Sequence, residues 1–447
     1  MATVVSPGPP GPPGNVLLGH LLELSRDHLG FLHECVRRYG DVVAIRFGRR
    51  SVVVINEPRD VEYVLVTNQR NFSKGYFYRL LGPAIGNGLL TSEGTFWRRQ
   101  RRLAQPAFHH QRINAYAETM TDFSQEALVT WRAGEQRNVH DDLMRLTLRI
   151  VGKTLFGADI EASAPVVGRA LPRALAAMNT LITGPEFVLP GGVPTPSRIR
   201  LRRAVAQLDP LVFRLIAQRR ESREDNGDLL SALLRAQDED GGQMTDRQLR
   251  DEAMTIVLAG HETTALALTW ALYLLSQTPV ARATIEAEVD GVLAGRTPRL
   301  EDVAHLPFTE AVFLETMRLY PPAFGIGREV IDRCEIGGYQ FEPGTGVYIV
   351  PWIIHRDPRW FDEPELFQPA RWMDGLAKRL PRFAYFPFGG GPRLCIGQQF
   401  AMLEGIVILS SIVQRWRLDL APGQDMTPKP AITLRPRNGM KMTVSAR

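Results

Sequence analysis

One cysteine-containing loop near the carboxyl end constrains this chain more than any other feature. Residues 386–397 read FPFGGGPRLCIG, with Cys395 as the cysteine. Consecutive glycines let a backbone pass close to a flat macrocycle, where a Cβ atom would collide. The apolar stretch 398–414 predicts a helix, whose first-turn amides can donate hydrogen bonds to the sulfur and lower the thiol pKa. The pattern therefore favours an axial thiolate ligand over the buried structural cysteine that is the common alternative.

The fixed positions of this loop carry a resemblance. Phe388, Gly391, Arg393, Cys395 and Gly397 match the cysteine-ligand signature of the cytochrome P-450 family, which the chain therefore resembles. The resemblance implies heme b as the cofactor, with Cys395 as the axial ligand of the haem iron and Phe388 beside the haem. In this family the thiolate gives the iron electron density that favours O–O cleavage. The implied activity is a monooxygenase that inserts one atom of O2 into its substrate.

Composition excludes several other classes of protein. The 447 residues are 44% hydrophobic and 23% charged, with a net charge of +5, which is ordinary for a globular protein. No block of like charge is long enough for a nucleic-acid-binding arm. Cys35, Cys334 and Cys395 are too few and too scattered for a disulfide framework or a zinc site, which suits a reducing cytoplasm.

Both ends of the chain suggest how the protein is organised. Residues 1–15 form a proline-rich lead-in, and no stretch offers ~20 uninterrupted apolar residues, so we expect a cytoplasmic monomer without a membrane anchor. The chain ends at Arg447 without a fused flavin reductase. Electrons are therefore expected from an external ferredoxin or flavodoxin with its reductase. A basic patch would receive this carrier, and its members are Arg98, Arg99, Arg102, Arg382 and Arg393.

Periodicity predicts a single domain over residues 16–447 that is mainly α with a small β region. The segments 42–47 and 51–55 read as a hairpin, and residues 116–306 have a mostly helical period. Short strand-like segments return at 335–339 and 346–351. This α+β pattern is also the cytochrome P-450 fold that the resemblance implies.

The predicted helix 246–277 carries polar residues in an apolar context. Glu262 and Thr263 are costly inside a core unless they have partners or a function. Gly260 weakens a helix interior by about 1 kcal/mol relative to alanine, which suggests room for a ligand. Thr263 can bond back to the Ala259 carbonyl or release it and widen the helix. In the family's oxygen-binding motif, Ala259 lies against the haem, Thr263 delivers protons to dioxygen and Glu262 resupplies them. His261 is expected to have a structural role.

A second set of charges is expected to hold the fold. Glu315 and Arg318 are spaced i, i+3 on a predicted helix among apolar residues. Residues 367–372 resemble the family's meander, in which Arg371 joins this pair. Ala370 and Trp372 stand where the family usually has an acid and a phenylalanine. We predict that these three charged residues retain the fold and the haem.

The resemblance also implies donors for the two haem propionates. Trp97 and Arg101 lie in a W-R-x-x-R segment, Arg328 fits the strand position that follows the E-x-x-R helix, and Arg393 precedes the ligand by two residues. Arginine and tryptophan are suited to such anionic groups.

Apolar residues from separate segments are expected to line a substrate pocket. They are Phe77, Leu89, Phe187, Leu258, Ala323, Phe324 and Ile432. Such a lining favours a hydrophobic substrate: a terpenoid, a fatty acyl chain, a steroid or a polyketide-like molecule. The alternatives are a peroxide-driven haem–thiolate enzyme, which usually lacks the acid and alcohol of 262–263, and a non-catalytic haem–thiolate sensor or ligand-binding protein.

Overall fold

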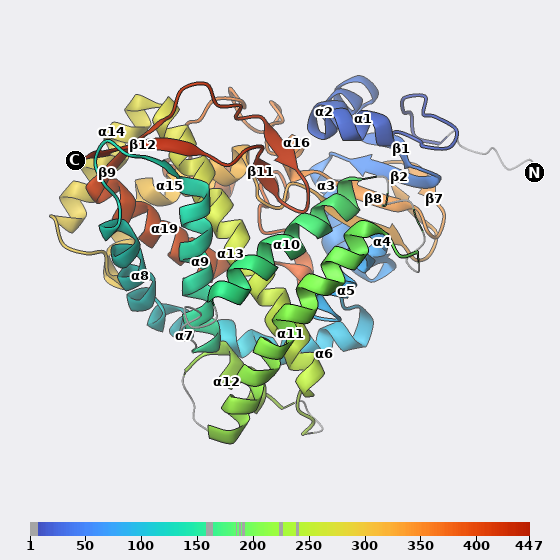
Figure 1. The fold of residues 1–447 in the computed structure, drawn as a ribbon. Coiled ribbons are helices and arrows are strands. Elements are labelled where there is room, and N and C mark those ends of the chain that lie inside the picture. Colours follow the sequence, from blue (N-terminus) through green and yellow to red (C-terminus); the bar gives the residue numbers. More distant parts are fainter. Residues whose placement is uncertain are drawn as a thin grey trace, which may run out of the picture.

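Helices make up most of the protein, and its largest sheet lies at one end. The structure is a computed structural model that describes residues 8–157, 164–184, 186, 189, 193–222, 227–237 and 241–447. Figure 1 shows the helices packed across the body, with β1, β2 and β8 beside the amino-terminal helices. The predicted class, mainly α with a small β region, is confirmed.

The helices and strands have the following bounds. The α-helices are α1 Leu21–Arg26, α2 His28–Tyr39, α3 Pro58–Glu62, α4 Gly75–Arg79, α5 Gly82–Ile85, α6 Gly94–Ala104, α7 His110–Ala115, α8 Ala117–Val129, α9 Val139–Phe156, α10 Ala164–Thr183, α11 Pro196–Ser222, α12 Leu229–Arg235, α13 Asp246–Gln277, α14 Pro279–Leu293, α15 Pro307–Leu319, α16 Pro351–Ile354, α17 Ala370–Met373, α18 Leu376–Arg379 and α19 Gln398–Arg415. The strands are β1 Val42–Phe47, β2 Arg50–Ile55, β3 Phe72–Ser73, β4 Gln136–Asn138, β5 Ile326–Val330, β6 Cys334–Ile336, β7 Tyr339–Phe341, β8 Gly346–Ile349, β9 Trp416–Leu420, β10 Pro428–Pro430, β11 Leu434–Pro436 and β12 Lys441–Ala446.

The largest sheet has the strand order β1-β2-β8-β5-β3. The predicted hairpin is confirmed as β1 paired antiparallel with β2, with Val43 opposite Val54. The pairing of β2 with β8 is parallel, which joins strands from opposite ends of the chain. Strand β5 was expected only from the family resemblance; its register sets Arg328 opposite Val347 of β8.

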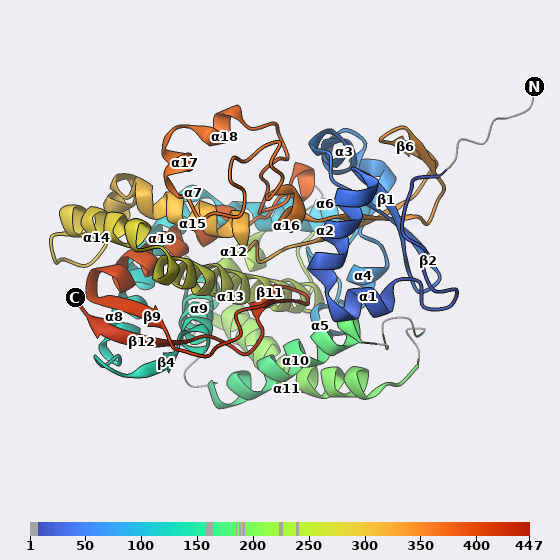
Figure 2. The same cartoon turned by 90° about the horizontal axis from the view of Figure 1, so that it is seen from above.

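Helix α13 forms the centre of the helical region. Its first turn is closed by a capping box in which Thr245 accepts from the Gln248 amide and Gln248 accepts from the Thr245 amide. Its bounds are those predicted from periodicity, and Pro279 follows its end. Figure 2 shows α10 and α11 on one side of α13, and α15 with α17 on the other. Among the described residues, no helix is long and apolar enough to cross a membrane.

Candidate active site

The glycines of the Cys395 loop are required by packing within the protein. A Cβ atom on Gly390 would lie 2.2 Å from Cε1 of the Phe383 ring, and one on Gly391 would lie 2.0 Å from the Leu65 carbonyl oxygen. Gly391 also has a φ of 66°, in the left-handed region. Approach to a macrocycle was the predicted reason for these glycines. At these two positions the contact that excludes a side chain is made by the protein itself.

Cys395 is accessible to solvent, and its loop is held by a backbone hydrogen bond. The backbone amide of Cys395 donates to the Phe388 carbonyl at 3.0 Å, which holds the loop. The cysteine is exposed, yet desolvation by surrounding atoms raises its pKa more than the Gly397 amide and the Arg101 guanidinium lower it. The Gly397 amide thus lowers the thiol pKa as predicted, although desolvation outweighs this lowering. An exposed cysteine whose thiol is surrounded by protein atoms fits a residue that binds a ligand.

Thr263 and Ala259 lie one turn apart on α13 and are more accessible than their neighbours. The Thr263 hydroxyl donates to the Ala259 carbonyl at 2.8 Å, and α13 runs through this turn as a continuous α-helix. Ala259 is exposed, whereas Leu258 on the adjacent helix position is buried. A Cβ atom on Gly260 would lie 3.3 Å from Val151 on α9, so close helix packing explains this glycine.

Glu262 is engaged by the carboxyl-terminal hairpin. Its Oε1 accepts a hydrogen bond from Nε of Arg435 at 2.7 Å, and also from Nη2 of Arg435 and the hydroxyl of Thr433. Sequence reasoning missed both partners, because no local signal links residues that lie so far apart. His261 is buried, with its ring bonded to the Val257 carbonyl at 2.6 Å, which agrees with the structural role expected for it.

Arg393 packs on Trp97 at the amino-terminal side of the site. The guanidinium carbon lies 4.1 Å from the centroid of the Trp97 ring. One Arg393 nitrogen donates to the Ser92 carbonyl at 2.9 Å, and another pairs with Glu93. Burial lowers the pKa of Arg393 to about 10 despite the Glu93 charge. The predicted pair of Trp97 and Arg393 is thus brought together, and Arg101 lies close enough for Cys395 to influence its pKa.

Lys74 is a further cation that sequence reasoning missed. It is buried, and its ammonium group donates to the Leu90 carbonyl at 2.5 Å. Its pKa is lowered well below the ordinary value, first by burial and then by the charges of Arg393 and Arg328. Arg328 itself donates to the Gly327 carbonyl at 2.8 Å. Several cations crowded together suit an anionic partner, so these residues fit the two propionates of a haem.

Glu315 is the centre of a completely buried ion-pair cluster. Arg318 donates to it from Nη2 at 2.8 Å and from Nε at 2.9 Å, and Nε of Arg371 on α17 donates at 3.0 Å. Both Glu315 and Arg318 are fully buried. The remaining Arg318 donors reach backbone carbonyls, including that of His355 at 2.9 Å. The structure thus brings together the three residues that were predicted to form one cluster.

Trp372 explains one departure from the family pattern. Its indole Nε1 donates to Oε2 of Glu315 at 2.8 Å, which a phenylalanine cannot do. The Gln368 amide donates to the other oxygen, Oε1, at 3.0 Å. Trp372 also packs against Tyr385, with ring centroids 4.5 Å apart. The substitution therefore adds a hydrogen-bond donor to the buried carboxylate.

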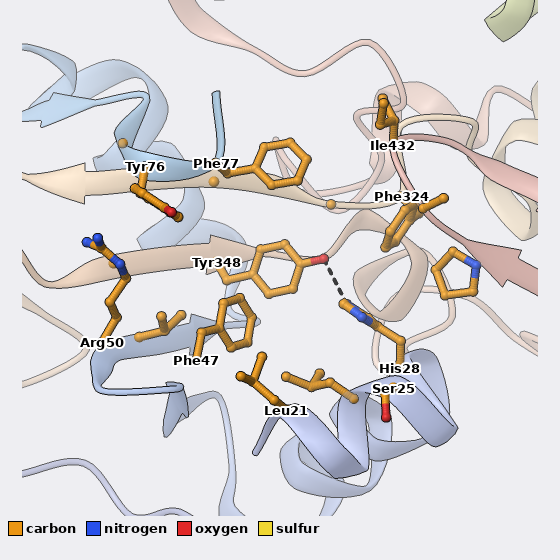
Figure 3. A pocket seen from close by; sticks show the side chains of 18 of the residues that line it. Leu21, Ser25, His28, Phe47, Arg50, Tyr76, Phe77, Phe324, Tyr348 and Ile432 are labelled. Atoms are coloured by element: carbon orange, nitrogen blue, oxygen red, sulfur yellow. Dashed lines mark hydrogen bonds between the residues drawn. The ribbon is translucent and has the colours of Figure 1, made fainter. Parts of the chain in front are cut away.

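A cavity of about 760 Å³ lies beside the site. In Figure 3, Phe77 from α4, Phe324 from the segment after α15 and Ile432 from the β10–β11 turn converge on it. The hydroxyl of Tyr348 and the ring of His28 are hydrogen-bonded at 3.1 Å in its wall. Three of the predicted pocket residues therefore line this cavity.

The other predicted pocket residues are placed elsewhere. Leu89 and Leu258 are buried in the core, and Ala323 is exposed without lining this cavity. Phe187 lies outside the described residues. Neither Cys395 nor Thr263 lines the cavity, which extends toward α1 and the β1–β2 hairpin.

Comparisons with known proteins agree with this geometry. The family model described as Cytochrome P-450 matches residues 9–444. Cyclooctatin synthase of Streptomyces melanosporofaciens is 40% identical, covering 95% of this chain and 92% of the relative. Pentalenene oxygenase of Streptomyces avermitilis is 33% identical, covering 97% of both chains. The solved structure of a cyanobacterial CYP120A1 with retinoic acid bound has a TM-score of 0.88 and 27% identity, covering 99% of this chain and 100% of the other.

Proposed function

The chain belongs to the cytochrome P-450 family, and we propose that it is a haem–thiolate monooxygenase that hydroxylates an apolar terpenoid. The observation that carries this proposal is the Cys395 loop, combined with an accessible Thr263 on the central helix. A terpenoid is favoured over fatty acyl, steroid or polyketide-like substrates. Relatives named for cyclooctatin and pentalenene, and a similar fold with bound retinoic acid, support that class.

The donors around the site fit heme b. Cys395 would hold the iron, and Trp97, Arg101, Arg328 and Arg393 would hold the propionates, with Lys74 as an additional donor. When bound, the haem supplies a thiolate-ligated iron at which dioxygen is reduced and its O–O bond is cleaved. Phe388 and Ala259 would contact the macrocycle.

The chain's own residues would supply protons and orient the substrate. The overall reaction consumes R–H, O2, two electrons and two protons, and yields R–OH and one water. Thr263 would release the Ala259 carbonyl and donate its hydroxyl proton toward dioxygen. Glu262 would resupply that proton after leaving Arg435. Phe77, Phe324 and Ile432 would orient an apolar substrate, because the cavity they line is largely hydrophobic where they meet.

The electron carrier is proposed to be an external ferredoxin or flavodoxin. Arg98 and Arg102 are exposed on α6, and a second cavity of about 510 Å³ lies beside them. Its lining is Arg102, Gln105, Pro106, His109, Gln111 and Arg112. Such a basic concave surface suits an acidic carrier.

Three members of the predicted basic patch have other partners. Arg393 is turned toward Trp97 and Glu93, Arg382 pairs with Glu62 at 2.7 Å, and Arg99 donates to the Gln243 carbonyl. The proposed carrier site keeps Arg98 and Arg102, which are exposed on α6.

A reconstituted system tests the proposed function. Purified protein with a ferredoxin, its reductase and a panel of cyclic terpenes, fatty acids and steroids should consume oxygen in step with a hydroxylated terpene. Product formation with hydrogen peroxide alone would favour the peroxide-driven alternative. Spectral binding of terpenes without oxygen consumption or product would favour a non-catalytic sensor and would overturn the proposal.

A further inference from the structure

The β10–β11 hairpin joins the cavity to the central helix. At its turn, the amide of Ile432 donates to Oδ1 of Asn179 on α10 at 3.2 Å. The amide of Leu434 donates to the Pro322 carbonyl at 3.0 Å, and Nε1 of Trp270 on α13 donates to the Leu434 carbonyl at 3.0 Å. Ile432 also projects toward the cavity in Figure 3. One short hairpin therefore contacts the cavity, α10 and α13.

The same hairpin holds the Glu262 carboxylate. Arg435 donates to Oε1 of Glu262 from Nε at 2.7 Å and from Nη2, and the Thr433 hydroxyl donates to the same oxygen. The side chains of Glu262 and Arg435 are only 2% and 23% exposed, so water competes weakly for this pair.

Glu262 is directed away from the hydroxyl that it is expected to supply. Its Oε1 accepts from Arg435 and Thr433 of the hairpin, and Thr263 is not among its hydrogen-bond partners in the described part of the chain. The Thr263 hydroxyl meanwhile donates to the Ala259 carbonyl. Both members of the acid–alcohol pair are thus occupied by other partners in this structure.

We propose that Arg435 and Thr433 are positioning residues that latch Glu262, and that a substrate seated against Ile432 releases the latch by moving the hairpin. This inference rests on the proposed function and adds control of proton supply to it. Without substrate, the latch withholds protons from dioxygen. With substrate, the released carboxylate turns to Thr263 and proton delivery begins.

The contacts of the β10–β11 hairpin give a physical basis for the coupling between substrate binding and release of Glu262. A ligand shifts an equilibrium only through different contacts in the two states. Ile432 provides such a contact, since the residues that follow it at the turn carry both donors to Glu262. The bond to Asn179 also ties the turn to α10, so α10 and the latch move together.

The latch prevents loss of electrons in the absence of substrate. One electron from the reduced enzyme and one proton convert O2 into HO2•, and two HO2• give hydrogen peroxide and O2. An unlatched Glu262 would supply that proton and accelerate the loss.

Reoxidation of the pre-reduced, substrate-free holoenzyme tests the latch. Protein reduced with dithionite is mixed with oxygenated buffer, in H2O and in D2O, and the return of the oxidised spectrum is timed. Arg435→Gln should reoxidise several-fold faster than the parent with a smaller solvent isotope effect, and Thr433→Val should show a smaller acceleration. The double variant Arg435→Gln/Glu262→Gln should return to the slow rate of the parent.

A matched control separates the latch from loss of an ion pair in general. Arg417 on β9 forms a two-point pair with Glu286 on α14, at 2.6 and 2.9 Å, away from the cavity. Arg417→Gln should leave the reoxidation rate unchanged. If Arg435→Gln is recovered without haem, Arg435→Lys, which keeps the charge but not the two-nitrogen contact, replaces it with the same expected direction.

Two results would overturn the latch. One is a reoxidation rate and isotope effect in Arg435→Gln and Thr433→Val equal to those of the parent. The other is a double variant that stays as fast as Arg435→Gln, because the acceleration would then not pass through Glu262. Either result leaves hydroxylation by the parent intact, so failure of the latch is distinguishable from failure of the proposed function.

Discussion

Two buried glutamates, Glu315 and Glu262, are held in opposite ways. Both oxygens of Glu315 are occupied, by donors from Arg318, Arg371 and Trp372 and by a backbone amide. These donors come from α15, α17 and the segment before α17. Glu262 receives its three hydrogen bonds on one oxygen, from a single hairpin.

We infer from this difference that the ion pair of Glu315 is permanent, whereas the ion pair of Glu262 can open. Releasing Glu315 would require α15 and α17 to part, with the charges left in a fully buried environment. Releasing Glu262 requires only a shift of β10–β11, whose Arg435 already reaches solvent. The first arrangement suits a fold that must hold a cofactor, and the second suits a group that must move.

The largest expected effect comes from breaking the permanent pair. Arg318→Ala leaves Glu315 charged without its main partner, and loss of one member of a buried pair typically costs about 3–5 kcal/mol. We expect misfolded protein or protein without haem. Arg382→Ala, which removes an exposed pair with Glu62, should change the unfolding free energy by less than ~1 kcal/mol. Soluble, fully haem-loaded Arg318→Ala would contradict this account of the cluster.

A third buried carboxyl group, that of Glu404, extends the comparison, because no charged donor among the described residues bonds to it. Glu404 on α19 is fully buried, and desolvation raises its pKa to about 8, although the Thr264 hydroxyl lowers it. Because the pKa of Glu404 is higher in the folded state than in the unfolded state, its neutral form stabilises the fold. This contribution is fully present below the unfolded-state pKa and is lost as the pH rises to about 8. Over that interval the loss amounts to at most about 5 kcal/mol.

Glu404→Gln tests this prediction, because glutamine stays neutral. Melting temperatures of the parent and the variant are compared from pH 5.5 to pH 8.5. The parent should lose stability relative to the variant as the pH rises. Parallel curves over the whole range would show that Glu404 does not change its charge there.

Trp372→Phe tests the hydrogen bond that the Trp372 indole adds to Glu315. Its expected effect on the unfolding free energy is smaller. It removes the 2.8 Å bond to the carboxylate while keeping an aromatic ring, and a hydrogen bond to a charged group is worth about 1.5–3 kcal/mol. Denaturant unfolding should show a loss in that range with haem retained. An unchanged unfolding free energy would mean that the remaining donors compensate fully.

Of these substitutions, Thr263→Ala should change the unfolding free energy least and the catalysed reaction most. Thr263 is only half-buried and bonds its own helix, so the unfolding free energy should change by less than ~0.5 kcal/mol. Product per electron should fall several-fold, with hydrogen peroxide as the excess. Glu262→Gln should instead slow oxygen consumption. Full coupling in Thr263→Ala would remove Thr263 from the proton path.

The sequence predicted elements that depend on local pattern. The bounds of α13, the β1–β2 hairpin and the Glu315–Arg318 spacing all follow from periodicity and helix geometry. Partners distant in the chain could not be predicted in this way. Lys74 near Arg393, and Thr433 with Arg435 on Glu262, are brought together only by packing. The lowering of the Cys395 pKa by a helix amide was predicted locally, but the larger desolvation comes from atoms that only packing brings together.

The identity of the thiolate ligand is the central claim, and the carbon monoxide spectrum of the reduced protein tests it most directly. The parent, Cys35→Ser and Cys334→Ser should all show the red-shifted Soret band of a thiolate haem. Cys395→His should lose that band while still binding haem, because imidazole replaces the thiolate. Retention of the red-shifted band in Cys395→His, or its loss in Cys35→Ser or Cys334→Ser, would contradict the assignment of Cys395.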